Sequence, residues 1–172
     1  MKSMYIHIPF CGSICSYCDF CKFFYNDEIA NKYIDSLINE ISLNYKKEIL
    51  DTIYIGGGTP SSLNIKQLDK LLSYIYNNVK VSSELEYTIE CNVMDITKEK
   101  LELFKKYNIN RLSIGVESFN SKILSFLERN YNKEDIITKI KLAKMYFNNI
   151  NIDLMYAIPN ETIDILKEDI NE

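Results

Sequence analysis

Residues 4–21 read MYIHIPFCGSICSYCDFC, an apolar, strand-like segment that runs straight into a loop with four cysteines. The spacing Cys11-x3-Cys15-x2-Cys18 places three thiols on one short stretch of chain. Disulfide frameworks usually spread their cysteines through a small secreted chain, so this clustering indicates a metal or iron–sulfur centre. A 4Fe–4S cluster commonly takes four thiolates. With only three, one iron stays open to a small ligand.

Zinc is the alternative for the same loop. Cys15-x2-Cys18 and Cys18-x2-Cys21 each have zinc-knuckle spacing, and with Cys11 four thiolates would close a structural zinc site. The glycine run and the strand-end acids described below favour the cluster, because a zinc knuckle needs neither. We interpret Cys21 as a free, partly buried thiol and the distant Cys91 as a small core residue.

Outward from this loop, the apolar periodicity alternates between strand and helix. Strands are predicted at residues 4–10, 52–55, 86–90, 111–116 and 151–156. Helices are predicted between them and after the last strand, with N-caps at Asn26 or Asp27, Asn64 and Asn132. The first helix has a predicted apolar stripe made of Ile29, Tyr33, Leu37, Ile41 and Tyr45.

Alternating strands and helices imply a parallel sheet with right-handed crossovers. A closed barrel of eight such units takes about 250 residues, whereas these 172 residues hold five units. The predicted α/β fold is therefore a partial (β/α) TIM-type barrel, with residues 1–172 forming one incomplete core domain. We expect open edges on its first and last strands. The final helix, from Thr162, should have little for Ile163, Leu166 and Ile170 to cover.

The distinctive residues follow the strands, at the end where such folds place their chemistry. Gly56-Gly57-Gly58 follows the second strand, Glu90 the third and Glu117 the fourth. Glycines let the backbone approach a ligand closely, although a plain tight turn is the alternative. Neither phosphate-loop pattern, GxxxxGK[ST] or GxGxxG, is present. Asp153 lies within an apolar strand, where a buried carboxylate needs a partner.

Composition narrows the function classes. The net charge is −4, and lysine and arginine form no long block, which argues against nucleic acid as a partner. No apolar run approaches the roughly 20 residues of a membrane span. The amino-terminal segment lacks a signal-peptide core, so we expect a cytoplasmic protein.

Four segments carry a family resemblance that extends along the whole chain. They are YIHIPFC with Cys15, Tyr17, Cys18, Asp19 and Phe20, then GGGTPS (56–61), NRLSIGVESFN (110–120) and NIDLMY (151–156) with Pro159. They resemble the oxygen-independent coproporphyrinogen III oxidase-like family of radical S-adenosylmethionine (SAM) proteins. The resemblance implies a 4Fe–4S cluster whose open iron binds the amino and carboxylate groups of SAM. Electron transfer then releases methionine and a 5'-deoxyadenosyl radical.

The resemblance also implies individual roles. Cys11, Cys15 and Cys18 would hold the cluster. The expected SAM contacts are Tyr5, Gly57, Gly58, Thr59, Glu90, Glu117, Arg129 and Asp153. Taken alone, Arg129 would be interpreted as a surface charge and Glu90 as a solvated strand-end charge. The family usually has Gln at position 117, so Glu117 should add a negative charge near the SAM carboxylate and weaken binding.

Two branches of the family differ just after the third cysteine. The oxidase branch has another cysteine at the position of Phe20, whereas Asp19-Phe20 resembles the heme chaperone branch. That branch implies heme as a ligand and heme-acceptor proteins as partners. The alternative is an oxidase that decarboxylates propionate side chains. Family members continue past this length into further barrel strands and a second domain, so a shortened chain is expected. His7, the only histidine, is interpreted as a hydrogen-bonded strand residue.

Overall fold

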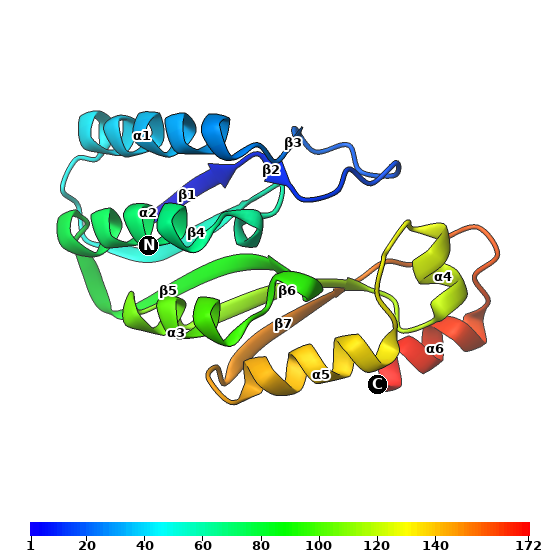
Figure 1. Cartoon of the computed structure of the whole chain (residues 1–172). Coiled ribbons are helices and arrows are strands. Elements are labelled where there is room, and N and C mark those ends of the chain that lie inside the picture. Colours follow the sequence, from blue (N-terminus) through cyan, green and yellow to red (C-terminus); the bar gives the residue numbers. More distant parts are fainter.

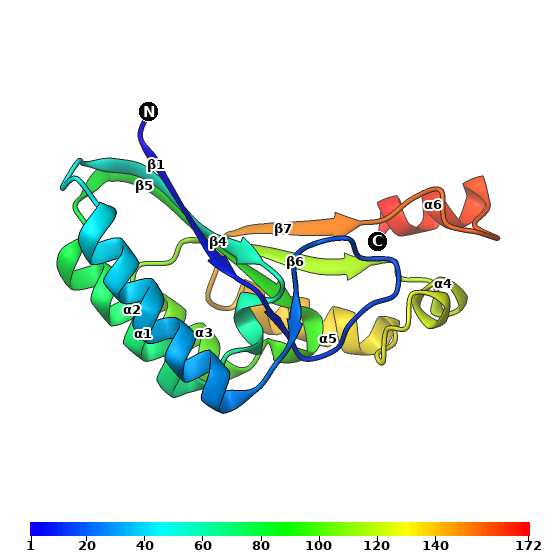
Figure 2. The same cartoon turned by 90° about the horizontal axis from the view of Figure 1, so that it is seen from above.

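The computed structural model describes all residues 1–172. Five parallel strands form one sheet, with neighbours in the order β1 (Ser3–Ile8), β4 (Leu50–Gly57), β5 (Val81–Asn92), β6 (Arg111–Glu117) and β7 (Asn149–Leu154). One face of the sheet is covered by α1 (Asp27–Asn44), α2 (Ile65–Asn78), α3 (Lys98–Lys106) and α5 (Lys133–Lys144) (Figures 1 and 2). The predicted α/β partial barrel is confirmed, with β1 and β7 as the outer strands.

Shorter elements lie near the carboxyl ends of the strands. Strands β2 (Phe10–Cys11) and β3 (Phe23–Phe24) pair with each other, and the segment between them carries the remaining cysteines of the loop. The others are the 3-10 turns η1 (Pro60–Ser62) and η2 (Val93–Asp95), and the helices α4 (Ser121–Phe126) and α6 (Ile163–Asn171). Helix α6 lies beyond the end of β7 (Figure 2). Its Ile163 and Ile170 are exposed, as predicted, whereas Leu166 is half-buried.

The two faces of the sheet differ in chemistry. Alternate strand residues such as Ile55, Ile89 and Ile114 are buried among the helices. The residues between them face the other way, as strand geometry requires, and many are polar: Tyr54, Thr88, Glu90, Ser113 and Asp153. A TIM-barrel interior is normally filled with bulky branched residues. This polar inner face is suited to binding ligands.

Two strands end earlier than predicted. The strand expected over residues 4–10 is broken at Pro9, which has no N–H to continue the pairing. Strand β1 therefore ends at Ile8, and the chain turns into β2. At the other edge β7 ends at Leu154, not at residue 156, and Ala157 adopts a φ of 61° in the turn that follows. Strand β5 is longer than the predicted 86–90.

The helix caps are as predicted, but the buried face of α1 is not. Asn26, Asn64 and Asn132 each accept a backbone N–H at the start of a helix. In α1 the buried residues are Ala30, Ile34, Leu37 and Ile41, while Ile29 is 59% exposed. The predicted stripe is wrong at Ile29, whereas Tyr33 and Tyr45 are half-buried against the core. Residues spaced as 29 and 33 or as 30 and 34 both fit the helical period, so the pattern did not decide which pair faces the sheet. The small Ala30 suits a position against the sheet.

Candidate cofactor site at the carboxyl ends of the strands

The cysteine loop joins β2 to β3. Cys11 is buried, Cys15 and Cys18 are half-buried, and Cys21 is exposed, so the predicted partial burial of Cys21 was wrong. Cys21 precedes β3, whose Phe23 and Phe24 are themselves exposed, so nothing nearby covers it. Cys91, by contrast, lies in the core as predicted.

The thiols lie near one another without forming a single-ion site. No three Cys, His, Asp or Glu side chains are close enough to hold one metal ion. Burial raises the pKa of Cys11, and the nearby thiols of Cys18 and Cys15 raise it further. A structural zinc gathers all its ligands on one ion, whereas an iron–sulfur cluster spreads its thiolates over several irons. The loop offers three buried or half-buried thiols and a fourth that is exposed, a donor set that fits a cluster held by three thiolates.

The glycine run packs against the cysteine strand. A Cβ at Gly58 would lie 2.9 Å from the Phe10 carbonyl and 3.0 Å from Cys11 Sγ. Thr59 donates its N–H to the Phe10 carbonyl at 2.7 Å and its hydroxyl to Cys11 Sγ at 3.5 Å. Gly57 has a φ of 121°, which favours glycine. These glycines therefore allow close contact within the chain itself, besides leaving the backbone open to a ligand.

Glu90 holds the glycine run in place. Its carboxylate accepts the Tyr54 hydroxyl at 2.7 Å and the Gly57 N–H at 3.0 Å. Burial raises the pKa of Glu90, although these two hydrogen bonds oppose the shift. Glu90 is thus not the solvated strand-end charge that its position alone would suggest. Sequence reasoning missed Tyr54, whose only signal was the alternation within β4.

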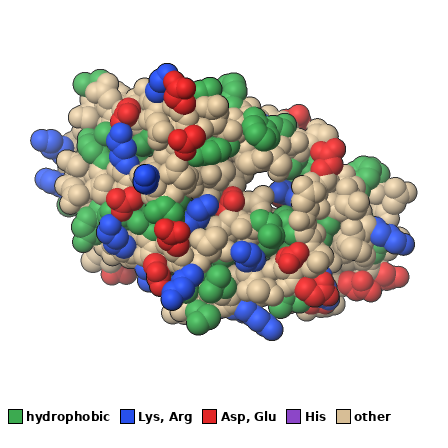
Figure 3. Space-filling model, in the orientation of Figure 1, with side chains coloured by type: hydrophobic (Ala, Val, Ile, Leu, Met, Phe, Trp, Pro, Cys, Tyr) green, Lys and Arg blue, Asp and Glu red, His purple; other side chains and the backbone are tan.

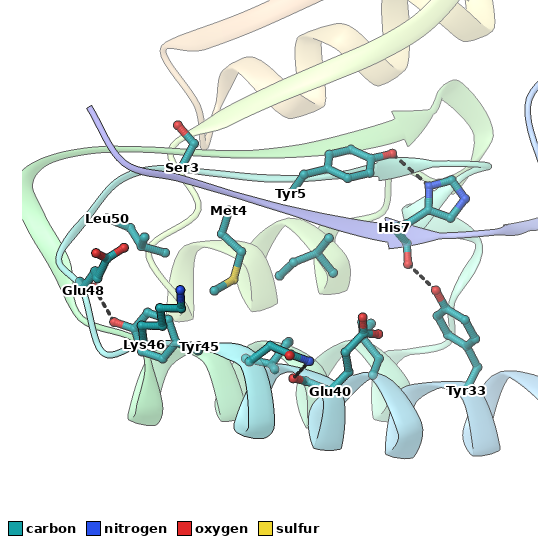
Figure 4. A pocket seen from close by; sticks show the side chains of 14 residues that line it. Ser3, Met4, Tyr5, His7, Tyr33, Glu40, Tyr45, Lys46, Glu48 and Leu50 are labelled. Atoms are coloured by element: carbon teal, nitrogen blue, oxygen red, sulfur yellow. Dashed lines mark hydrogen bonds between the residues drawn. The ribbon is translucent and has the colours of Figure 1, made fainter.

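Tyr5 and His7 lie side by side on β1. The Tyr5 hydroxyl is 3.0 Å from His7 Nδ1, and Tyr33 donates to the His7 carbonyl at 2.7 Å (Figure 4). The Tyr5 ring stacks on Tyr54 at a centroid distance of 6.2 Å, yet Tyr5 remains 59% exposed. A cavity of about 500 Å³ lies beside them, between β1 and α1 (Figure 4), away from Glu117 and Asp153.

Glu117 and Arg129 form an ion pair at the end of β6. Arg129 Nη2 lies 2.6 Å from Glu117 Oε1, and both side chains are mostly buried. Burial raises the pKa of Glu117, and Arg129 opposes that shift. The structure adds a counter-charge that the sequence did not indicate, because Arg129 pairs with the Glu117 carboxylate. Because it is mostly buried in this pair, Arg129 is not a surface charge. The effect of Glu117 on SAM binding stays a prediction.

Asp153 lies on the inner face but is not buried. It accepts Ser113 Oγ at 3.0 Å and Asn151 Nδ2 at 2.6 Å, and its side chain is exposed. The predicted burial was wrong because β7 is an outer strand and nothing covers this part of the inner face. The apolar neighbours in sequence face the other way or lie beyond the strand.

Contacts from the cysteine loop reach the turn after α4. Arg129 Nη2 donates to the Tyr17 hydroxyl at 2.7 Å, and the Ser16 N–H donates to Glu128 Oε2 at 3.2 Å. In the space-filling view an opening passes through the molecule, between the part with the cysteine loop and the part with α4 (Figure 3). No local pattern in the sequence points to Glu128, and Tyr17 is marked only as part of the cysteine segment.

The strand ends therefore collect most of the predicted residues. The cysteine loop, the glycine run with Glu90, the Glu117–Arg129 pair and Asp153 all lie at the end of the sheet toward which its parallel strands point (Figure 2). A model of the radical SAM superfamily matches residues 5–172. The chain belongs to the radical SAM superfamily. Membership implies a 4Fe–4S cluster and SAM as cofactors.

Relatives of this radical SAM chain include heme chaperones and oxidases. It is 42% identical to the heme chaperone HemW of Bacillus subtilis, over 99% of this chain and 46% of that protein. It is 31% identical to the oxygen-independent coproporphyrinogen III oxidase of Salmonella typhimurium, over 93% of this chain and 36% of that protein. The structure matches coproporphyrinogen III oxidase (HemN) from Escherichia coli with a TM-score of 0.90 and 29% identity, over 99% of this chain and 40% of that one.

The match covers only part of these relatives. The chain spans about half the length of the heme chaperones it matches, 46% and 45% for the relatives from Bacillus subtilis and Lactococcus lactis. None of its helices combines the length and the apolar character needed to span a membrane.

Proposed function

We propose that this chain is the radical SAM core of a heme chaperone. In this proposal Cys11, Cys15 and Cys18 hold a 4Fe–4S cluster, whose remaining iron is open to the amino and carboxylate groups of SAM. The observation that carries it is the convergence at one edge of the sheet of a three-thiol loop, a glycine run and carboxylates from separate strands. A structural zinc knuckle would need only the thiols.

Several residues are available to hold SAM. Arg129 Nε is buried and has no hydrogen-bond partner, so it is a donor left over for a ligand carboxylate. Glu90 fixes the backbone of Gly57, next to Gly58 and Thr59, which would contact the methionine part of SAM. The ring of Tyr5 and the carboxylate of Asp153 are exposed on the inner face, where they would contact the rest of the SAM molecule.

The protein's share of the chemistry is binding and orientation. When bound, the cluster supplies the electron that cleaves SAM reductively. Thr59 donates to Cys11 Sγ, which favours the thiolate that an iron requires. A cytoplasmic location would support this proposal, because a reducing compartment keeps the thiols of the loop available as ligands.

Iron analysis tests the cluster. Anaerobically reconstituted chain should absorb near 400 nm and carry about four irons, as thiolate-bound 4Fe–4S clusters do. Cys15→Ser should abolish both signals, because it removes one of the three proposed thiolate ligands. The fold should survive, because Cys15 is half-buried and is not part of the core. Cys21→Ser is the matched control and should leave them intact. Stoichiometric zinc in place of iron, or loss of the cluster in Cys21→Ser, would refute the assignment.

Heme and heme-acceptor proteins are the partners that follow from the heme chaperone relatives. Heme titration of the cluster-loaded chain should give a saturable Soret shift. The close structural match to HemN favours the oxidase as the second candidate. Decarboxylation of coproporphyrinogen by the loaded chain, without heme binding, would replace the chaperone proposal with that one.

A further inference from the structure

The cysteine loop is fastened to a part of the chain more than a hundred residues away. The Ser16 N–H donates to Glu128 Oε2 at 3.2 Å. One residue on, the Tyr17 hydroxyl accepts Arg129 Nη2 at 2.7 Å, and the same nitrogen donates to Glu117 at 2.6 Å. Ser16 and Tyr17 are the two residues between Cys15 and Cys18. These contacts therefore act on the stretch of chain that carries two of the three thiols.

Packing reinforces these polar contacts. Tyr17 packs against a small apolar cluster separate from the main core, made of Ile123, Leu127 and Ile158. The Arg129 guanidinium lies 5.9 Å from the centre of the Tyr17 ring. Tyr17 thus starts in the loop after β2 and ends among residues that follow β6 and β7. The loop therefore connects the first strand–helix unit of the partial barrel to the later ones, next to the opening seen in Figure 3.

Backbone strain is found at the same contacts. Glu117 has a φ of 70° and Glu128 a φ of 58°, in the left-handed region that disfavours side chains. Glycine would relieve that strain but would remove the carboxylate. Both carboxylates are linked to the cysteine loop. Glu128 accepts the Ser16 N–H, and Glu117 is linked through Arg129, which also bonds Tyr17. Strained residues persist where the surrounding contacts over-determine them, and they often mark functional positions.

We propose that Tyr17, Glu128 and Arg129 form a latch, which holds the cysteine loop across the carboxyl ends of the strands in the partial barrel. Tyr17 and Glu128 are positioning residues: they fix the direction of the chain between Cys15 and Cys18. The latch consists of protein groups alone, so it orders the loop whether or not metal is bound. Its value for cluster binding rests on the proposed function, because a preorganised loop loses less conformational entropy when its ligand binds.

Amide hydrogen exchange of the full chain tests the latch. In anaerobically reconstituted protein, Tyr17→Phe and Glu128→Gly should each speed exchange of the 12–20 segment by about fivefold, the effect of losing one net hydrogen bond. A chelator should also remove iron faster from both variants. Tyr146→Phe and Asn108→Gly are matched controls. The Tyr146 hydroxyl makes only a long hydrogen bond of 3.4 Å to Glu102, and Asn108 has a φ of 62° and does not belong to the loop.

The stability of Glu128→Gly separates the latch from a merely structural role. If Glu128 only stabilised the fold, the urea midpoint of this variant would fall. If Glu128 acts in the latch, the variant relieves strain, so its urea midpoint should be unchanged or higher even as the loop loosens. Glu128→Gln keeps an oxygen acceptor and should restore most of the protection lost in Glu128→Gly. Exchange of the 12–20 segment within about twofold of the controls in both Tyr17→Phe and Glu128→Gly would overturn the latch. Exchange can also be read on metal-free chain, whereas iron content reports on the proposed function, so the two failures are distinguishable.

Discussion

The carboxylate of Glu117 and the guanidinium of Arg129 lie 2.6 Å apart, with side chains only 14% and 12% exposed. The pair joins the end of β6 to the turn after α4, and through Tyr17 to the cysteine loop. Its two charges cancel at the edge of the candidate SAM site. Removing either partner therefore changes both the stability of the fold and the electrostatics of the site, in directions that differ between the two residues.

The first prediction concerns stability. Arg129→Gln leaves the Glu117 carboxylate buried without a counter-charge, which should lower the free energy of unfolding by about 3 kcal/mol. The double variant Arg129→Gln/Glu117→Gln should recover much of that loss, since it buries no unpaired charge. Urea denaturation at neutral pH measures both. Equal stability of the single and double variants would show that the pair is not coupled.

The second prediction concerns SAM affinity. Glu117→Gln releases Arg129 from its anionic partner and leaves its positive charge free for the SAM carboxylate. Binding should tighten by about tenfold, the scale of one charge-assisted hydrogen bond. Calorimetry with SAM on cluster-loaded chain gives the dissociation constant. Weaker binding would mean that the Glu117 carboxylate itself contacts SAM, through its amino group or ribose hydroxyls.

The third prediction concerns the glycine run. A Cβ at Gly57 would lie 2.6 Å from the His7 ring, and the φ of 121° disfavours any side chain. Gly57→Ala should cost roughly 1–3 kcal/mol of stability and should weaken SAM binding. Gly12→Ala is the control, because a Cβ there has nothing within 4 Å. Thermal melts of both variants, with SAM calorimetry, make the comparison. Similar melting temperatures for both variants would contradict the close packing of β4 against β1.

The fourth prediction concerns pH. Burial raises the pKa of Glu90 above the usual 4.5, so the folded state binds its proton more tightly than the unfolded state does. The stability from this group is present at low pH and is lost as pH rises through the folded pKa. Glu90→Gln cannot ionise, so its urea midpoint should gain on the wild type as pH increases from 4.5. The midpoints should be measured from pH 4.5 to pH 8. A constant difference across this range would mean that the Glu90 pKa is not raised in the fold.

Much of the site was predictable because it is local. Cys11, Cys15 and Cys18 share one loop, and the glycine run directly follows a strand. Parallel strands bring their carboxyl ends to one edge, so placing Glu90 and Glu117 near the loop required only the order of the elements. The helix caps at Asn26, Asn64 and Asn132 were predictable for the same reason, since a cap bonds within three residues of itself.

The sequence by itself thus determined the order of the strands and helices, the caps and the edge at which the site forms, because these depend on periodicity and on contacts between near neighbours. Tertiary structure alone decided which partner each charged side chain of the site bonds. Arg129 meets Glu117 and Tyr17, Glu128 meets Ser16, and Tyr54 meets Glu90 across distances in sequence that no local pattern encodes. Asp153 stays exposed although its strand reads as apolar, because burial depends on which strands and helices pack over a residue.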